Sequence, residues 1–204
     1  MHHGARAIKN KGPTMLRLIR QSEMASGPWR NGMGVSWEIA SHKEQDDAEF
    51  SWRFAKARID RDVPFSIYHG MDRVFMQISG NGLVLEFEGG QKIEVHQSNV
   101  PYAFACDIPL KCKLLDGPCF DLNLFTVRGK FEAQVSVLNL SGMETLDLTG
   151  VDAVFFALGG SAVLSGQGGA VLLNKGDAAV ASHEQAVNVA GHGAVVFVGI
   201  LSMF

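Results

Sequence analysis

Short apolar or alternating runs, each ended by glycine, asparagine or aspartate, follow one another along most of the chain. Few segments carry the 3.6-residue period of an amphipathic helix, and glycine is frequent, with 23 among 204 residues. Short runs with a two-residue alternation or a fully apolar character are typical of strands. Such a series predicts an all-β chain built as sandwiches or barrels. The predicted strands are 50–59, 73–79, 83–87, 111–115, 120–127, 135–140, 153–158, 162–164, 170–173, 178–181 and 195–201.

A constant offset within the chain indicates an internal repeat. Five residues of the first half recur 79 positions later. This separation is about the length of one small β-barrel, so the pattern predicts two similar β-modules. Because no Pro- or Ser-rich linker lies between them, we expect the modules to form one continuous body. The repeated residues are Gly80, Val84, Leu85, Gly89 and Gly90, matched by Gly159, Val163, Leu164, Gly168 and Gly169.

The two expected modules cover residues 15–130 and 131–204, and they differ in chemistry. From Val135 onward the chain holds one Lys, Lys175, and no Arg, Trp or Tyr. All three Trp and both Tyr lie in the first module. We therefore expect a polar binding site in the first module and a structural role for the second. Residues 1–14, with their adjacent histidines, are expected to be a disordered leader or tag.

Charge and cysteine content exclude several classes of protein. Five of the 18 Lys and Arg precede the first acid, Glu23, which leaves 13 against 21 Asp and Glu. A body that binds nucleic acid should be basic, so no nucleic-acid partner is expected. The apolar runs are too short to cross a bilayer and no signal-peptide core is present, so no membrane partner is expected either. Cys106, Cys112 and Cys119 fit no disulfide or zinc spacing, which favours reduced thiols in a cytoplasmic protein.

Motifs for metal, nucleotide or nucleophilic chemistry are absent from the sequence. No H-x-H or H-E-x-x-H occurs, although two inward-facing His on one strand need the first spacing. "NGMG" and "GQGG" lack the remaining residues of a phosphate loop. We expect the first to be a tight turn and the second, at 166–169, a hairpin turn. No G-x-S-x-G elbow is present, so no metal, cofactor or catalytic residue is expected.

Polar side chains share strand faces with small or aromatic ones on three predicted strands. Because side chains alternate along a strand, each face can be read from the sequence. An arginine beside two alanines on a concave face would leave room for an anionic ligand. The alternative is that these faces are solvated surface, and no single strand separates the two interpretations; their repetition on three strands favours a cavity. The faces carry Arg53, Ala55 and Ala57; Arg73, Phe75 and Gln77; and Asp121, Asn123 and Phe125.

Four blocks between Trp29 and Gly129 resemble the HutD/Ves family of bicupins. They are "PWRNGMGVSWEIA", "FSWRFAKARI", "VPFSIYHGMDRVFMQISGNG" and "LLDGPCFDLNLFTVRG", in the order of the family. Met33 replaces a Gly of the first block, and Ala55 stands where the family usually has Ser. The resemblance implies an all-β bicupin of two jelly-roll-like barrels, with a ligand pocket in the first and a degenerate second cupin.

The resemblance also implies a function. The family is associated with bacterial histidine utilisation and with no catalytic metal. The implied role is a non-enzymatic regulator that binds a small carboxylate such as urocanate or N-formylglutamate. A guanidinium would pair with the carboxylate, and the amide and carboxylate side chains would bond its other polar groups. The matching ligand-binding positions are Trp29, Asn31, Glu38, Arg53, Asp72, Arg73, Asp121 and Asn123.

Two other functions stay open from the sequence. The first is a metal-free cupin isomerase or lyase that acts on a small acid with Glu38 or Asp121 as its base. The second is a structural or interaction module whose cleft is vestigial. A homodimer is an expected assembly of such barrels, although the sequence carries no interface signature.

Overall fold

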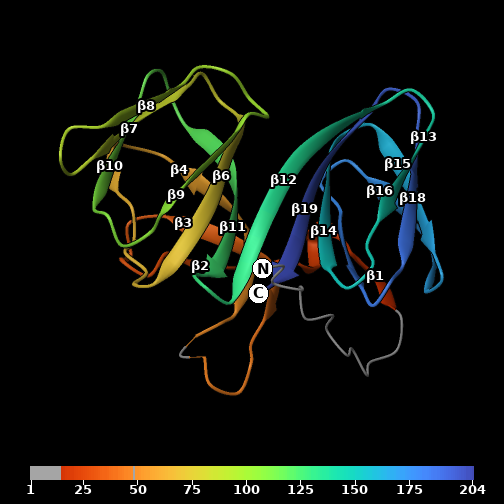
Figure 1. The fold of residues 1–204 in the computed structure, drawn as a ribbon. Coiled ribbons are helices and arrows are strands. Elements are labelled where there is room, and N and C mark those ends of the chain that lie inside the picture. The colour runs from red at the N-terminus through yellow and green to blue at the C-terminus, as the bar shows by residue number, and fades with distance from the viewer. Residues whose placement is uncertain (1–14, 48) are drawn as a thin grey trace. The chain divides into compact units, whose positions relative to one another are not determined.

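The computed structural model describes residues 15–47 and 49–204, and most of them lie in strands (Figure 1). The described residues form two compact units. We call residues Met24–Arg128 the first barrel, and residues 15–23 with 129–204 the second barrel. Each pairs a larger sheet with a four-stranded sheet, so the expected all-β pair of barrels is confirmed. The expected leader, 1–14, lies outside the described residues.

The first barrel has a six-stranded sheet in the order β2-β3-β4-β11-β6-β9 and a four-stranded sheet in the order β5-β10-β7-β8. All its strand pairs are antiparallel. The strands are β2 (Ala25–Pro28), β3 (Val35–His42), β4 (Trp52–Ile59), β5 (Val63–Pro64), β6 (Met71–Ser79), β7 (Leu83–Phe87), β8 (Lys92–Val95), β9 (Pro101–Ala105), β10 (Leu110–Leu114) and β11 (Cys119–Val127).

The second barrel has a five-stranded sheet in the order β1-β17-β14-β19-β12 and a four-stranded sheet in the order β13-β18-β15-β16. Its strands are β1 (Met15–Ile19), β12 (Phe131–Leu140), β13 (Met143–Asp147), β14 (Asp152–Gly159), β15 (Ser161–Gly166), β16 (Gly169–Asn174), β17 (Ala178–Ser182), β18 (Ala186–Ala190) and β19 (Ala194–Met203), with a 3-10 turn η1 (Gln21–Glu23). Gly166 pairs with Gly169, so the predicted hairpin turn is confirmed. No described helix is long and apolar enough to span a bilayer.

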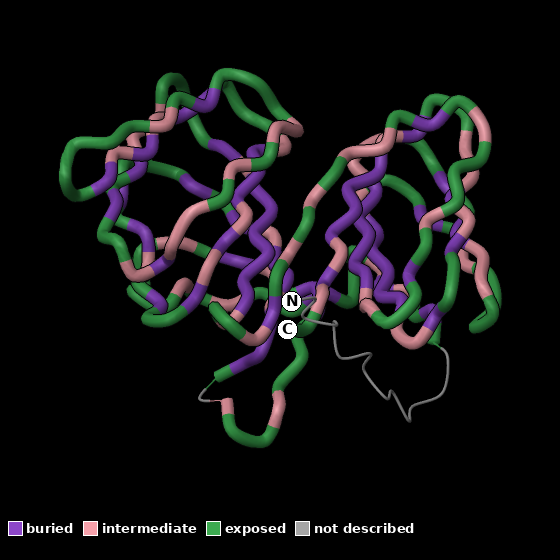
Figure 2. Tube along the Cα trace, in the orientation of Figure 1, coloured by how far each residue is buried: buried purple, intermediate pink, exposed green. Residues whose placement is uncertain are grey.

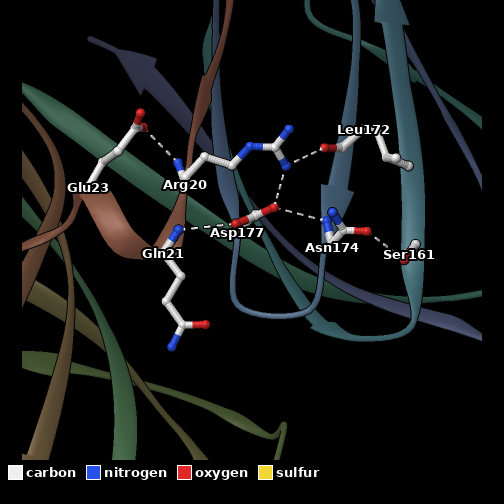
Figure 3. Close-up of polar contacts among 7 residues, drawn as sticks. All are labelled: Arg20, Gln21, Glu23, Ser161, Leu172, Asn174 and Asp177. Atoms are coloured by element: carbon white, nitrogen blue, oxygen red, sulfur yellow. Dashed lines mark hydrogen bonds and ion pairs between the residues drawn. The ribbon is translucent and has the colours of Figure 1, made fainter.

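Residues 15–23 belong to the second barrel. The sequence pattern had placed them in the first module, which was expected to cover residues 15–130. They belong to the second barrel because β1 pairs antiparallel with β17 over its whole length. Asp177 adds a polar tie: its carboxylate accepts hydrogen bonds from Arg20 Nη1 at 2.7 Å and from the Gln21 amide at 3.0 Å (Figure 3). The Asn174 amide donates to the same carboxylate at 3.1 Å. This carboxylate thus joins η1 to the turn before β17.

Burial alternates along strands such as β7, whereas β11 and β14 are buried on both faces (Figure 2). The second barrel encloses an almost purely aliphatic cluster, in which Phe155 is completely buried. The first barrel encloses a cluster around Phe75, Leu83 and Leu85, and its inner face also buries polar side chains. The polar part of this inner face forms the candidate site.

Candidate functional site

A cavity opens into the first barrel, with about 420 Å³ of empty space counted out to its open mouth. Strands β3, β4, β6 and β11 form one wall, and the segment between β5 and β6 forms another. The lining residues are Trp29, Ser36, Arg53, Ala55, Ala57, Phe65, Ser66, Tyr68, Arg73, Asp121, Asn123 and Phe125.

The register of three neighbouring strands brings the charged residues of this wall together. Phe125 on β11 lies between Arg53 on β4 and Arg73 on β6. Two residues along the strand, Asn123 lies opposite Ala55. Because the side chains of alternate residues share a face, both arginines and the β11 polar pair point to the same side of the sheet. The small alanine leaves the space that the sequence pattern predicted.

Arg73 is buried at the back of the cavity among aromatic rings. Its guanidinium carbon lies 4.5 Å from the ring centre of Phe125, 4.8 Å from that of Phe65 and 5.7 Å from that of Phe104. Its side chain is near the Cys106 thiol, whose pKa is raised by burial against the opposing effect of Arg73. Arg73 makes no ion pair within the described residues, and its Nε has no hydrogen-bond partner there. Cation–π contacts hold this charge in place without neutralising it.

Asp121 and Asn123 form a buried polar pair on β11. The Asn123 side-chain amide donates a hydrogen bond to Asp121 Oδ1. Burial raises the pKa of Asp121 to about 6, against the opposing effects of the Asn123 hydrogen bond and the Arg73 charge. Asp121 Oδ2 and Asn123 Oδ1 have no partner among the described residues. Two acceptors are thus left unused in a site where an unpaired polar atom is costly.

Arg53 differs from Arg73 because its charge is compensated. Its Nε donates to Glu38 Oε2 at 2.9 Å, and Ser41 Oγ donates to the other oxygen of Glu38. The Arg53 side chain is 19% exposed, whereas that of Glu38 is 47% exposed. Glu38 therefore lies toward solvent and orients Arg53, which itself lines the cavity.

The turn "PWRNGMG" forms part of the wall through Trp29. The indole Nε1 donates to the Val35 carbonyl, and the ring packs edge-on against Phe65, with centres 5.9 Å apart. The two glycines serve different purposes. Gly32 has φ +70°, as a tight turn requires. Gly34 leaves room for the indole, since a Cβ there would lie 2.5 Å from the ring.

The structure brings five of the eight predicted ligand-binding residues to the cavity: Trp29, Arg53, Arg73, Asp121 and Asn123. The other three do not line it. Asn31 holds the turn, with its Nδ2 donating to the Pro64 carbonyl and its Oδ1 accepting from the Met33 amide. Glu38 pairs with Arg53.

Asp72 is the third residue outside the cavity. It follows the alternation of β6 and points away from Arg73. Its carboxylate pairs with Arg128, which also binds Asp107 and thereby lowers the pKa of Asp107 to about 2. Asp72 therefore belongs to a surface ion network at the ends of β6 and β11, and not to the site.

Several lining residues were not predicted, and most of them come from the segment between β5 and β6. Phe65, Ser66 and Tyr68 lie on this segment, which has no strand pattern of its own. Tyr68 packs against Phe125 with ring centres 5.2 Å apart and lies under the Arg30 guanidinium. Ser36 could have been found from the sequence, because it lies two residues before Glu38 on β3.

The cavity does not have the donors of a metal centre. Its lining holds one carboxylate, one amide and two arginines but no histidine. Neutral imidazoles and several carboxylates are the usual protein ligands, and a guanidinium would repel a cation. Within the described residues, no group of three or more His, Cys, Asp and Glu could hold a metal ion. The arrangement instead suits an anion that also carries a hydrogen-bond donor.

Several solved structures share the fold of this chain. A conserved protein of unknown function from Pseudomonas aeruginosa PAO1 superposes with a TM-score of 0.80 at 24% identity, covering 93% of this chain and 99% of that one. HutD from Pseudomonas fluorescens SBW25 gives 0.77 at 22% identity over the same shares. Oxalate decarboxylase from Bacillus subtilis gives 0.66 at 11% identity, covering 95% of this chain and 78% of that one. These likenesses establish the bicupin fold.

Sequence comparison gives two curated relatives. An uncharacterised 21.2 kDa protein from the hutC 3′ region of Pseudomonas putida is 28% identical over 60% of this chain. Protein Ves from Citrobacter koseri is 33% identical over 53% of it. The chain spans 64% of the first relative and 56% of the second. The sequence model of the HutD family matches residues 21–197, and the chain therefore belongs to the HutD family.

Proposed function

We propose that the first barrel binds a small organic carboxylate and that this binding regulates bacterial histidine utilisation. Membership of the HutD family suggests the link to this pathway. Urocanate and N-formylglutamate are the candidate ligands. Three buried free thiols agree with the cytoplasmic location that such a role requires.

The observation that carries the proposal is the position of Arg73, a buried guanidinium in the cavity wall that makes no ion-pair contact within the described residues. This residue is 6% exposed, lines the cavity and makes no ion pair in the described chain. A buried guanidinium is costly unless an anion pairs with it. A ligand carboxylate would supply that anion, and a planar carboxylate fits a guanidinium well.

The chemistry on β11 restricts the rest of the ligand. Asp121 Oδ2 and Asn123 Oδ1 are unused acceptors, so the ligand should present an N–H group to them. The imidazole of urocanate and the formamide of N-formylglutamate both carry such a group. The rings of Trp29, Phe65 and Tyr68 would pack against a flat ligand, which favours urocanate.

Thermal-shift measurements on the full chain test this proposal. Urocanate, N-formylglutamate and histidine are each added at increasing concentration, with the uncharged amide of urocanate as the matched control. Binding to the folded state raises the melting temperature by mass action. We expect urocanate to stabilise the protein and its amide to have no effect. The proposal fails if none of the three acids shifts the melting curve.

A second candidate function is supported by Asp121. A buried carboxylate with a pKa of about 6 inside a cavity is suited to general acid–base catalysis near neutral pH. The corresponding function is a metal-free isomerase or lyase with Asp121 as base; Glu38, the other candidate base, is tied to Arg53 outside the cavity. Incubation of the protein with each ligand, followed by proton NMR, distinguishes the two functions. New resonances would favour the enzyme, and unchanged spectra with a thermal shift would favour the binding protein.

A further inference from the structure

The cavity of the first barrel encloses one buried acid, Asp121, together with two arginines. Asp121 is 1% exposed, and the charged residues of the lining are Asp121, Arg53 and Arg73. Glu38 pairs with Arg53 from outside the lining, so these two charges balance each other. Arg73 makes no ion-pair contact within the described chain, and the charge of Asp121 balances it at longer range. When Asp121 is ionised, the wall therefore carries no net charge.

The other titratable groups that surround Asp121 are two thiols and a phenol. Cys112 on β10 and Cys119 on β11 both interact with the charge of Asp121. Burial raises the pKa of each thiol, so both stay protonated and uncharged near neutral pH. Tyr68 contributes its phenol from the segment between β5 and β6, and no described Lys or His lines the cavity. These groups leave Asp121 as the carboxylate that opposes the charge of Arg73.

A bound carboxylate would change this balance of charge. Arg73, Asp121 and the ligand anion would together place one positive and two negative charges in a site where both side chains are almost completely buried. A buried charge without a partner is costly, and two carboxylates that share one site do not both stay ionised. One proton on the Asp121 carboxyl group would remove the excess charge. The ligand carboxylate would then be the counter-charge of Arg73.

We propose that the first barrel takes up one proton from solvent with each carboxylate that it binds, and that Asp121 holds this proton. The inference rests on the proposed function, because it requires an anion at Arg73. Asp121 Oδ2 is the place for the proton, since it has no partner among the described residues, whereas Oδ1 accepts the hydrogen bond from Asn123. The protonated oxygen can donate to an acceptor of the ligand, while Asn123 Oδ1 accepts from its N–H group. Imidazole and formamide groups carry such a donor and acceptor side by side.

The pKa of Asp121 sets the pH range in which this coupling acts. Burial raises that pKa to about 6, against the opposing charge of Arg73. A carboxylate bound at Arg73 cancels the opposing charge and so raises the pKa of Asp121 further. The complex therefore binds more protons than the free protein does. Affinity is highest below about pH 6 and falls as the pH rises from there to the pKa of Asp121 in the complex.

Isothermal titration calorimetry on the full chain counts the proton. The acids titrated are urocanate and N-formylglutamate, the second of which has no group that titrates near neutral pH. Each titration at pH 7 is run in phosphate and in Tris, whose ionisation enthalpies differ, so the difference in observed heat gives the number of protons taken from the buffer. We expect an uptake of about one proton per ligand, and an affinity that falls by up to about tenfold from pH 7 to pH 8. Binding without proton uptake overturns the proposal and leaves the proposed function intact, whereas no binding of either acid overturns both.

A pair of variants tests whether Asp121 holds the proton. Asp121→Asn has no carboxyl group to titrate, so its proton uptake at pH 7 should fall close to zero, whatever its affinity. Asp72→Asn is the matched control: it makes the same substitution at a carboxylate that pairs with Arg128 outside the cavity, and it should keep the uptake of the wild type. Circular dichroism checks that both variants are folded. An uptake by Asp121→Asn equal to that of the wild type would place the proton elsewhere and contradict the proposal.

Discussion

The two barrels differ in the side chains that occupy their interiors: those of the first are partly polar and line a cavity, and those of the second are aliphatic. On β11, Asp121 and Asn123 face the interior of the first barrel beside Arg73. On β19, the strand in the same place of the second barrel's sheet, Val196 and Val198 face an aliphatic interior. Both pairs are almost completely buried. The backbone thus accepts either chemistry, and the hollow polar interior is a property of the first barrel's side chains.

This difference in interior side chains indicates which barrel gains more folding free energy from its core. Aliphatic side chains gain free energy from burial, whereas a buried carboxylate and a buried guanidinium lose hydration. The first barrel keeps both, together with acceptors that have no partner. We infer that its polar interior is retained for binding, and that the second barrel supplies a filled and stable partner domain.

The largest expected effect is on the stability of the second barrel, whose interior is filled by aliphatic side chains. Phe155→Ala removes a completely buried ring from the aliphatic cluster and should lower the free energy of unfolding of the second barrel by about 3–5 kcal/mol. Urea denaturation followed by circular dichroism measures this loss. Phe204→Ala, at a 72% exposed position, is the control and should change stability by less than about 0.5 kcal/mol. A loss below about 1 kcal/mol for Phe155→Ala would show that this interior is not tightly packed.

The second expected effect is on ligand binding by the first barrel, which contains the cavity. Arg73→Met keeps most of the side-chain volume but removes the charge, so it should weaken carboxylate binding about 10- to 100-fold, the range for a charge-assisted hydrogen bond. Isothermal titration calorimetry measures the dissociation constant. Arg58→Met is the matched control, because Arg58 pairs with Asp60 on the surface. Equal affinities for the two variants would remove Arg73 from the site.

The third expected effect is on the pH dependence of stability. Burial raises the pKa of Asp121 to about 6, so the protonated form favours folding: its contribution is complete below about pH 4 and is lost as the pH rises through 6. Asp121→Asn should therefore raise stability by about 1–3 kcal/mol at pH 8 and by much less at pH 4. Denaturation at the two pH values measures the difference.

The same variant should also weaken ligand binding, because the amide replaces an acceptor of the site by a partial donor. Asp116→Asn, in an exposed turn, should show neither effect. If Asp121→Asn destabilises the protein at pH 8, its carboxylate is a structural group and the comparison between the barrels loses its basis.

The smallest expected effect concerns the turn beside the cavity. Gly34→Ala places a Cβ against the Trp29 indole and should displace this wall, weakening binding several-fold. Gly32→Ala meets no atom but strains a residue with φ +70°, so it should cost about 1 kcal/mol of stability and leave affinity unchanged. Thermal melts with and without ligand separate the two results. The reverse pattern would exchange the roles assigned to the glycines.

Sequence patterns predicted the fold because strand alternation is local. All eleven predicted runs lie within strands or overlap them closely, and the 79-residue offset falls on β7 and β15. Some of the unpredicted strands, such as β5 and β8, are short or polar, and their pairing partners define them. β1 shows the limit most clearly, because its place in the second barrel depends on pairing with a strand far along the chain.

The site was predictable where it depends on one strand. Alternation identified Arg53, Arg73 and Asn123, and it argues against Asp72, which is adjacent to Arg73 and so faces the other way. Glu38 shows the limit of this reading: it lies opposite Ala55 in the register, yet its side chain is 47% exposed and pairs with Arg53 instead of lining the cavity. The aromatic wall between β5 and β6 depends on packing between distant segments. It could not be read from the sequence.

A crystal structure of the full chain grown with urocanate tests the central claim most directly. The account predicts ligand density inside the first barrel, with the carboxylate within hydrogen-bond distance of the Arg73 guanidinium and the imidazole N–H directed at Asp121 or Asn123. The second barrel should hold no ligand, because its interior is filled. An empty first barrel at saturating urocanate, or a ligand whose carboxylate lies away from Arg73, would contradict the account.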